Sequence, residues 1–389
     1  MMVAGWQDDI RKLTFGIELE RFIFTKEEMP PSLDEINSVF ARLLEWGMTV
    51  KAYDREAGLI AIKRELPTGP LVVKNDFCSH IFEVAYPPAR TVAEFTAIFQ
   101  QSEQEIQLVL RDFSIAVRLG GALAAMPTTI IYRPSDSDYV RKRMSQYEKR
   151  PVPKRPFSHR NFFAGMSSTH IHLNVLEEPF YPRLPALYSV EYLIPLLYSQ
   201  SPVFNGCRAH CVRPLMYKDG FAESYRTVAI PDPIPSRPRQ YHEFLAASRG
   251  FIRDYSFIAP SWHGTVEFRT ACSQPTLDEI IELLALRVAI VLGVRNGYWQ
   301  QRPNLRSLFW NASLTGTAPQ SVLDEDHSIL TRIRAETFHL VATNGSMKKL
   351  NHRGRETRIS HPRGTVSYFP QQAMQPVTRS YPVWGCVRA

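Results

Sequence analysis

Alternating apolar and polar residues predict strands at several places along the chain. The stretch TFGIELERF, residues 14–22, alternates with a period of two, and similar patterns occur near 78–86, 169–175 and 264–270. Successive side chains of a strand point to opposite faces of a sheet, so each segment would have one apolar face and one polar face. We expect these strands, the first spanning about 15–24, to lie in one sheet.

Apolar residues at helical spacing predict long helices between the strands. Ser32 caps the pattern over residues 32–47, and Thr276 caps the pattern over 276–293; in both cases a Glu follows three residues later, as in a capping box. The pattern from residue 91 to the glycines at 120 and 121 predicts a single long helix. Strands interleaved with long helices indicate an α+β fold.

Bulk composition limits the class of protein. The 389 residues are 44% hydrophobic, enough for a large core, and the formal net charge of +8 suits anionic partners without selecting among them. The five cysteines are thinly scattered and odd in number, which favours a reducing compartment. The first residues lack the order of a signal peptide, and apolar runs stay shorter than a membrane span of roughly 18 residues. We therefore expect a soluble, cytoplasmic protein without a membrane partner.

Two segments concentrate basic residues. Residues 139–160 carry eight Lys or Arg, one Glu and three prolines, which predicts an extended loop. Residues 345–389 carry eight Lys or Arg against Glu356, with few helical signals. We expect a body of residues 1–344 followed by a basic, extended tail over 345–389. Neither segment contains a recognised nucleic-acid motif, so the sequence does not favour nucleic acid as a partner.

The polar faces of the predicted strands carry ionisable side chains. These residues are Glu18, Glu20, Glu83, His170, His172, Glu267 and Arg269. A half-solvated sheet would explain any one strand, but solvated faces usually carry Lys, Thr, Ser and Gln. Clustered carboxylates repel one another unless a cation neutralises them, and Glu with His are ligands of divalent metals. The pattern predicts a metal site that prefers Mg²⁺ or Mn²⁺ over Zn²⁺.

A separate segment, CRAHC, resembles half of a zinc site. It places Cys207, His210 and Cys211 close together in the sequence. A structural zinc site needs four ligands, and a second Cys or His pair is missing nearby. We interpret these cysteines as ordinary, partly buried thiols.

Six motifs together resemble a known family. In chain order they are TFGIELERF, SHIFEVAYPPART, SSTHIHLNV, LIPLLYSQSPVFNG, AESYRTVAIPDPIP and GTVEFRTACSQPTLDEI. In this order and at these intervals they resemble the carboxylate–amine ligases related to the bacterial type 2 glutamate–cysteine ligase, within the glutamine-synthetase-like superfamily. The resemblance covers roughly residues 13–315. It implies a curved, mainly antiparallel sheet with helices on its outer face.

The resemblance also implies a reaction and roles for residues. Such enzymes use ATP and Mg²⁺, or Mn²⁺, to make an acyl phosphate from a carboxylate, which an amine then attacks to give an amide. The implied metal ligands are Glu18, Glu20, Glu83, His170 and Glu267. The implied catalytic and nucleotide-binding residues are His172, Arg226 and Arg269. The expected substrates are a small glutamate-like carboxylate and an amine; a peptide or protein acceptor stays open, and superfamily analogy suggests a homodimer.

Three departures from the family pattern point away from an ordinary glutamate–cysteine ligase. Cys272 stands where the family often has Asp, the stretch SFIAPSWHG lacks the usual Arg, and the chain after about residue 315 does not follow the usual ending. We therefore expect a specialised amide-forming enzyme. Two alternatives remain: an amide hydrolase on the same scaffold, and a nucleotide-binding protein without turnover that engages a macromolecular partner.

Overall fold

The computed structural model describes residues 13–54, 58–76, 78–132, 152, 154–175, 180–220, 229–247, 256–261 and 264–336. All of them belong to one compact unit, Met1–Thr357. The second unit, Arg358–Ala389, lies outside the described residues. The predicted boundary at residue 345, the basic tail, most of the basic segment 139–160 and Arg226 therefore also fall outside them.

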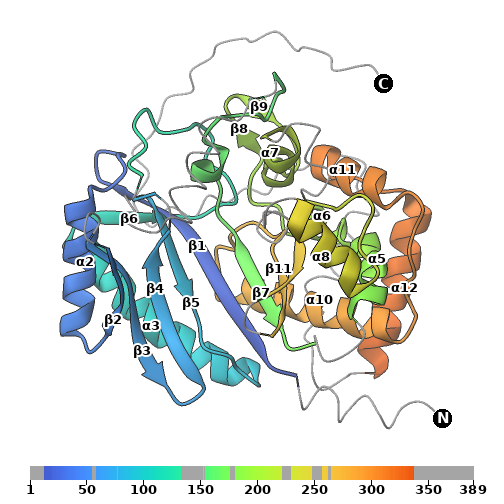
Figure 1. Ribbon diagram of the computed structural model, residues 1–389, viewed down its shortest axis with the longest axis horizontal. Helices are drawn as coiled ribbons and strands as arrows, with labels where there is room; N and C mark the ends of the chain where they lie inside the picture. The colour runs from blue at the N-terminus through green and yellow to red at the C-terminus, as the bar shows by residue number, and fades with distance from the viewer. Residues whose placement is uncertain are drawn as a thin grey trace. The chain divides into compact units, whose positions relative to one another are not determined.

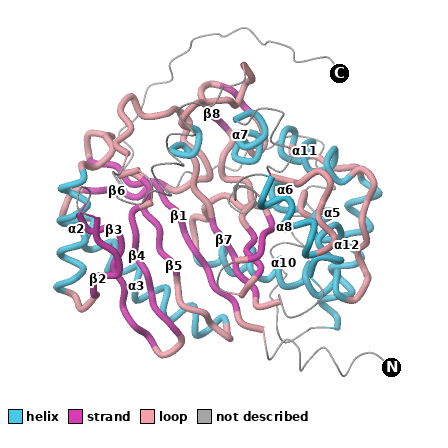
Figure 2. Tube along the Cα trace, viewed as in Figure 1, coloured by secondary structure: helices cyan, strands magenta, loops and turns pink. Residues whose placement is uncertain are grey.

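The described residues form a nine-stranded sheet in the order β10-β11-β7-β1-β5-β4-β3-β2, with β6 also paired to β1. The strands are β1 (Phe15–Thr25), β2 (Thr49–Asp54), β3 (Gly58–Leu66), β4 (Gly69–Asn75), β5 (Ile81–Ala85), β6 (Ile115–Arg118), β7 (Thr169–Leu173), β10 (Ile258–Pro260) and β11 (Val266–Phe268). Each pair of neighbours in this sheet is antiparallel. Figure 2 shows these strands side by side. The predicted antiparallel sheet is confirmed. A separate small sheet pairs β8 (Val203–Phe204) with β9 (Cys207–Arg208).

β1 is the central strand because it is long enough to serve several partners. It pairs with β5 along one edge. Along its other edge, its first half pairs with β7 and its last residues pair with β6. Segments from three distant parts of the chain therefore meet on β1, and their side chains extend its two faces.

Helices cover one face of the sheet (Figure 1). The helices of the described residues are α2 (Leu33–Glu45), α3 (Val92–Asp112), α5 (Phe180–Val190), α6 (Leu193–Leu197), α7 (Val212–Gly220), α8 (Pro238–Ala247), α10 (Leu277–Arg295), α11 (Leu305–Thr315) and α12 (Gln320–Glu336), with a 3-10 turn at Phe162–Gly165. α2 packs on β3, α3 packs on β6, and α10 packs on β7. Within the described part of the chain, no helix combines the length and apolar character needed to cross a membrane.

The apolar face of β1 explains this arrangement. Phe15, Ile17 and Leu19 are all buried in the main core. Phe15 meets Phe95 of α3 edge-on, with ring centroids 6.1 Å apart. Burying such side chains is the main favourable contribution to folding. The period-two pattern thus turns one face of β1 toward the helices and leaves Gly16, Glu18 and Glu20 on the other.

Helix boundaries follow the predicted caps, with one correction. The Ser32 hydroxyl accepts from the backbone N–H of Glu35, and the Glu35 carboxylate accepts from that of Ser32, which completes the capping box. Thr276 caps α10 by accepting from the backbone N–H of Glu279, while its hydroxyl donates to the Glu279 carboxylate. The prediction of one helix over 91–121 was wrong in its second part. α3 ends at Asp112, Ser114 adopts a left-handed φ of 58°, and the chain returns as β6.

Two buried ion pairs lie on the helix-covered side. Arg21 of β1 donates two hydrogen bonds, each 2.5 Å, to Glu103 of α3. Arg287 of α10 donates two to Glu191, at 2.5 and 2.7 Å, and its guanidinium lies 4.7 Å from the ring centroid of Phe268 in β11. Each pair is bidentate, which is the strongest geometry for a guanidinium and a carboxylate.

Candidate metal and nucleotide site

Strand register aligns the charged residues on the face opposite the helices. Three cross-strand pairs run across the sheet: Glu83 with Glu20, Glu18 with His170, and His172 with Glu267. Paired residues on neighbouring antiparallel strands place their side chains on the same face. The structure therefore brings together, from β5, β1, β7 and β11, all six of the predicted Glu and His residues.

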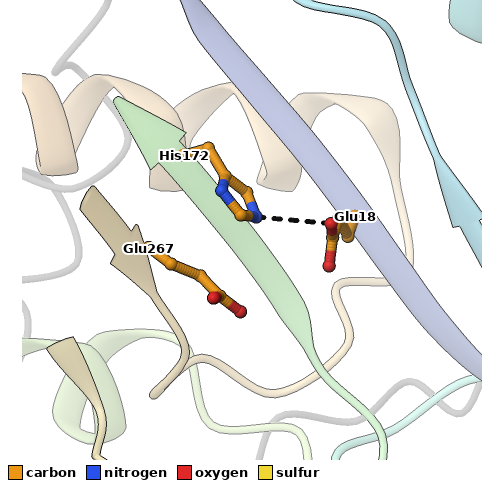
Figure 3. Close-up of side chains that lie close together, drawn as sticks. All are labelled: Glu18, His172 and Glu267. Carbon is orange, nitrogen blue, oxygen red and sulfur yellow. Dashed lines mark ion pairs between the residues drawn. The ribbon is translucent and has the colours of Figure 1, made fainter. Parts of the chain in front are cut away.

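A first group of potential metal ligands consists of Glu18, His172 and Glu267. Their ligand atoms lie within 4.8 Å of one another (Figure 3). Nε2 of His172 is 3.4 Å from Oε1 of Glu18. Nδ1 of His172 lies 3.0 Å from the Thr265 hydroxyl, which fixes the ring orientation and directs Nε2 toward the carboxylate. We call these residues the first donor group.

His170 adds an imidazole to the first donor group. The Ser168 hydroxyl donates its single proton to Glu20. The Ser168 oxygen also lies 2.7 Å from Nε2 of His170. Because the hydroxyl has no second proton to donate, Nε2–H of His170 is the donor in this bond. A neutral His170 then presents the lone pair of Nδ1 to Glu18 at 3.4 Å and to Glu267 at 3.3 Å. The Nδ1 lone pair and the two carboxylates then repel one another. A proton or a metal cation between them removes the repulsion.

A second group consists of Glu20, Asp76 and Glu83, whose ligand atoms also lie within 4.8 Å of one another. Glu83 is buried, and its Oε2 is 2.8 Å from Nζ of Lys74. Its other oxygen, Oε1, has no hydrogen-bond partner among the described residues. A buried carboxylate oxygen without a partner is costly unless a ligand satisfies it. We call these residues the second donor group.

Asp76 was missed in the sequence, because it lies in no strand. It follows β4 directly, and its backbone N–H donates to the carbonyl of Ile81 at the start of β5. Asn75 closes the turn between the two strands with bonds to three carbonyls. The available signal was the dipeptide Asn75-Asp76 seven residues before Glu83, since such residues favour turns.

The electrostatics of the two groups differ. Burial raises the pKa of Glu18, but the contacts with His170 and His172 outweigh it and hold that pKa well below its usual range. Burial lowers the pKa of His172, and the bond to Glu18 reverses this and raises it. Burial raises the pKa of Glu83 well above normal; Lys74 opposes this, while Glu18 and nearby carboxylates reinforce it. A divalent cation would stabilise the ionised form of all these carboxylates.

Arg269 lies at the edge of the first donor group. Its Nε is 3.4 Å from Oε1 of Glu267. The buried Arg213 of α7 donates to the backbone carbonyls of Arg269 at 2.8 Å and Thr270 at 3.0 Å. These hydrogen bonds from Arg213 therefore fix the backbone of the segment that carries Arg269. Arg226, the other predicted arginine, lies outside the described residues.

The donor set fits a hard or borderline divalent cation. Carboxylate oxygens dominate both groups, and imidazole nitrogens complete the first, a composition that suits Mg²⁺ or Mn²⁺. The orphaned Oε1 of Glu83 and the lone pair of His170 toward two carboxylates agree with that fit. Among the described residues, these two are the groups of three or more potential ligands.

The cysteines occupy a different place. Sγ of Cys211 is 3.6 Å from Sγ of Cys272, and both thiols are buried. His210 turns its Nε2 toward the carbonyl of Leu196, at 3.0 Å. Cys207, in the small β8–β9 sheet, is partly exposed. Cys272, the departure from the family pattern, thus packs against Cys211 and follows shortly after β11, the strand that carries Glu267.

Comparisons with known proteins identify the fold. No protein-family model matches the chain, and no curated protein sequence matches it either. Among solved structures, the chain is similar to a bifunctional glutathione synthetase from Pasteurella multocida, with a TM-score of 0.55 and 10% identity over 88% of this chain and 48% of that one. It is also similar to glutamate–cysteine ligase from Francisella tularensis in complex with AMP, with a TM-score of 0.56 and 11% identity over 88% of this chain and 81% of that one.

This chain spans about half the length of the bifunctional glutathione synthetase and most of the glutamate–cysteine ligase. At such identities the likeness concerns the fold, and that fold is the one that the six motifs predict. The chain therefore has the α+β fold of glutamate–cysteine ligase, with an open antiparallel sheet covered by helices on one face.

Proposed function

We propose that the protein is an ATP-dependent carboxylate–amine ligase, which forms an amide through an acyl-phosphate intermediate. The observation that carries the proposal is the pair of donor groups on one face of the sheet, each with its ligand atoms within 4.8 Å. The fold of glutamate–cysteine ligase supports it, and that relative was solved in complex with AMP. Carboxylates in such density, on a fold shared with ATP-using ligases, are best explained as ligands of the cations that accompany ATP.

Each group has a distinct task in this proposal. Bound Mg²⁺ or Mn²⁺ would screen the repulsion between an anionic carboxylate and the γ-phosphate and stabilise the charge of phosphoryl transfer. Glu18, His172 and Glu267 with His170 would hold one cation. Glu20, Asp76 and Glu83 would hold another. This places His172 among the metal ligands as well as near the phosphates.

Among the described residues, Arg269 is the one whose guanidinium we propose to contact the transferred phosphoryl group. It lies beside Glu267, at the edge of the first donor group. A fixed cation aimed at developing charge stabilises a transition state without reorganising. Arg213 holds the backbone of Arg269 and so fixes where that charge lies. We propose that Arg226 serves the substrate or the phosphates alongside it.

The proposed substrates are a glutamate-like amino acid that supplies the carboxylate and a second molecule that supplies the amine. The departures at Cys272 and before β11 support a specialised pair of substrates rather than glutamate with cysteine. The acceptor amine belongs to a free metabolite or to a peptide, and the assay below includes both.

The test is release of ADP and phosphate from Mg-ATP in the presence of pooled amino acids, amines and short peptides. We expect release that requires both a carboxylate and an amine, and its loss in the Glu18→Gln variant. The matched control is Glu45→Gln, an exposed glutamate at the end of α2. Amide cleavage without ATP consumption would instead support a hydrolase, and ATP binding without turnover in every pool would contradict the ligase.

A further inference from the structure

Arg213 of α7 differs from the other buried arginines in its surroundings. Within the described part of the chain, three arginines are at most 4% exposed: Arg21, Arg213 and Arg287. Arg21 and Arg287 each donate two hydrogen bonds to a glutamate. Arg213 forms no ion pair with a carboxylate of the described residues; its guanidinium donates to the carbonyls of Arg269 and Thr270, and its Nε has no partner among them. A buried guanidinium without a counter-ion is costly, so we expect an anion beside it.

This anion has to come from the chain itself. Arg213 is 1% exposed, so a solute anion does not reach it. The ring of Tyr217, whose centroid is 5.5 Å from the guanidinium, attracts a cation less strongly than a full negative charge does. Two buried thiols adjoin the region: Cys211 is two residues before Arg213, and Cys272 is two residues after Thr270. Either of them, as a thiolate, would supply the missing charge.

Hydrogen-bond donors converge on the sulfur of Cys272. The Ser201 hydroxyl accepts from the backbone N–H of Arg213 at 3.3 Å and keeps its own proton to donate. Its oxygen lies 3.2 Å from Sγ of Cys272 and 3.6 Å from Sγ of Cys211. Sγ of Cys211 is itself 3.6 Å from Sγ of Cys272, and the backbone of Gln200 adds a further hydrogen bond to Cys272. Donors that face a sulfur stabilise its ionised form.

The electrostatics favour a thiolate at Cys272 over one at Cys211. Burial raises the pKa of Cys272, but the hydrogen bond from Cys211, the charge of Arg213 and the hydrogen bond from Ser201 outweigh it and hold that pKa below its ordinary value. Burial raises the pKa of Cys211, and the neighbouring Cys272 raises it further. Cys211 and Arg213 are thus the titratable and charged neighbours that act on Cys272, one as a donor and the other as a cation.

The position of Cys272 connects it to the charged face of the sheet. It forms an isolated β-bridge with Ser168, which directly precedes β7, and it follows Arg269 by three residues. Gly121 leaves room for its side chain, since a Cβ at that glycine would lie 2.2 Å from Sγ of Cys272. The segment from Arg269 to Cys272 is therefore fixed at its beginning by Arg213 and at its end by the packing of the sulfur.

We propose that Cys272 is a thiolate that serves as the counter-ion of Arg213, and that this pair positions Arg269. Cys272 stands where the family pattern often has Asp, so the negative charge is kept while the group that carries it changes. The attraction holds the Arg213 guanidinium where it donates to the carbonyls of Arg269 and Thr270. Cys272 acts through Arg213 and is a positioning residue. Its effect on phosphoryl transfer rests on the proposed function, whereas the charge of its sulfur does not.

The test is the absorbance of the full chain in the thiolate band of the ultraviolet, under a reductant that keeps every cysteine as a free thiol. We expect one more thiolate in the wild type than in Cys272→Ser at neutral pH. The difference should disappear as the pH falls below about 6, where Cys272 takes up its proton. The matched control is Cys211→Ser, which removes the neighbouring thiol but supplies a hydroxyl donor, and it should keep the thiolate signal.

Two variants of Arg213 test what stabilises the thiolate. Arg213→Lys keeps the charge and should keep the signal, whereas Arg213→Met removes the charge and should return Cys272 to the thiol at neutral pH. Thermal unfolding shows whether each variant is folded. If Arg213→Met is not, the melting temperatures of Cys272→Asp and Cys272→Ser decide: the carboxylate should give the higher value at neutral pH, because it pairs with the buried guanidinium. An equal or lower value for Cys272→Asp overturns the ion pair.

The ligase assay measures the consequence for Arg269. Cys272→Ser should lower kcat by roughly tenfold with the KM of the carboxylate substrate little changed, because Arg269 is assigned to the transferred phosphoryl group. Cys272→Asp should recover most of that loss. Unchanged kcat in Cys272→Ser, in a variant that has lost the thiolate signal, overturns the positioning of Arg269.

The outcomes separate this inference from the proposed function. Equal thiolate absorbance in the wild type and Cys272→Ser, or a thiolate that persists in folded Arg213→Met, overturns the role of Cys272 and leaves the ligase proposal standing. The expected thiolate in a protein that shows no ligase turnover supports the ion pair and contradicts the ligase alone.

Discussion

The two faces of the central sheet both hold ionisable side chains, but they treat charge in different ways. On the helix-covered face, Glu191 and Arg287 are 0% and 1% exposed and satisfy each other through two hydrogen bonds. Thr270 donates a further hydrogen bond to Glu191. In this pair one positive charge meets one negative charge, and its polar atoms find their partners within the chain.

On the charged face, negative charges outnumber positive ones. Five carboxylates cluster there: Glu18, Glu20, Asp76, Glu83 and Glu267. Among the described residues, the permanent cations that form ion pairs with them are Lys74 and Arg269. The histidines contribute charge only when they are protonated. The folded chain thus leaves an excess of negative charge in one place.

This contrast separates a structural role from a functional one. A buried pair that is complete within the chain needs nothing from outside, whereas an incomplete cluster costs stability unless a ligand completes it. Among the described residues, both groups of clustered potential ligands lie on one face of the sheet. Substitutions in the buried pair and in the charged cluster therefore test whether each has a structural or a functional role.

The largest expected effect comes from breaking the complete pair. Glu191→Ala leaves the buried Arg287 without a partner and should lower the free energy of unfolding by about 3–5 kcal/mol. Urea denaturation followed by circular dichroism measures the change. The double variant Glu191→Leu with Arg287→Met should recover most of the loss, since it removes both charges. A loss below about 1 kcal/mol in the single variant would show that the pair is not structural.

The charged face should depend on a ligand, as the buried pair does not. Glu18→Gln removes one carboxylate of the cluster and also its contacts with His170 and His172, which favour the ionised form, so the metal-free protein should lose less stability than it does in Glu191→Ala. Mn²⁺ at about 100 times its dissociation constant should stabilise the wild type by about 2.7 kcal/mol. That gain should largely vanish in Glu18→Gln, and chelation with EDTA should reverse it in the wild type. Equal stabilisation of both proteins would contradict the metal site.

The sequence predicted the charged face well because its signal is local. Alternation within β1 and β7 decides which side chains share a face, and caps such as Ser32 decide where a helix begins. The predicted Glu and His residues that the structure describes all lie on one face for that reason. Which of them act as ligands, and the role of Arg226, stay predictions.

Other features depend on contacts that a single segment does not reveal. The strands β2 and β3 were missed, although Gly58 and Gly69 mark their turns with positive φ values of 77° and 137°. β6 was assigned to a helix, because its strand character depends on pairing with β1. Asp76 joins its group only through the β4–β5 turn. Lys74 acquires meaning only once the register places it against Glu83.

The smallest expected effect concerns the support of the first donor group rather than its ligands. Ser168 is buried and donates to Glu20 while it accepts from His170, so it orients one residue of each group. Ser168→Ala removes the hydroxyl and frees the ring of His170, and losing such a supporting bond typically costs roughly tenfold in metal affinity. We expect that loss in a Mn²⁺ titration, with the unfolding transition of the metal-free protein little changed. Ser38→Ala, on the exposed surface of α2, is the matched control and should bind Mn²⁺ as the wild type does. Unchanged affinity in Ser168→Ala, beside a clear loss in Glu18→Gln, would mean that the strands alone position the ligands and that the hydroxyl contributes nothing to the site.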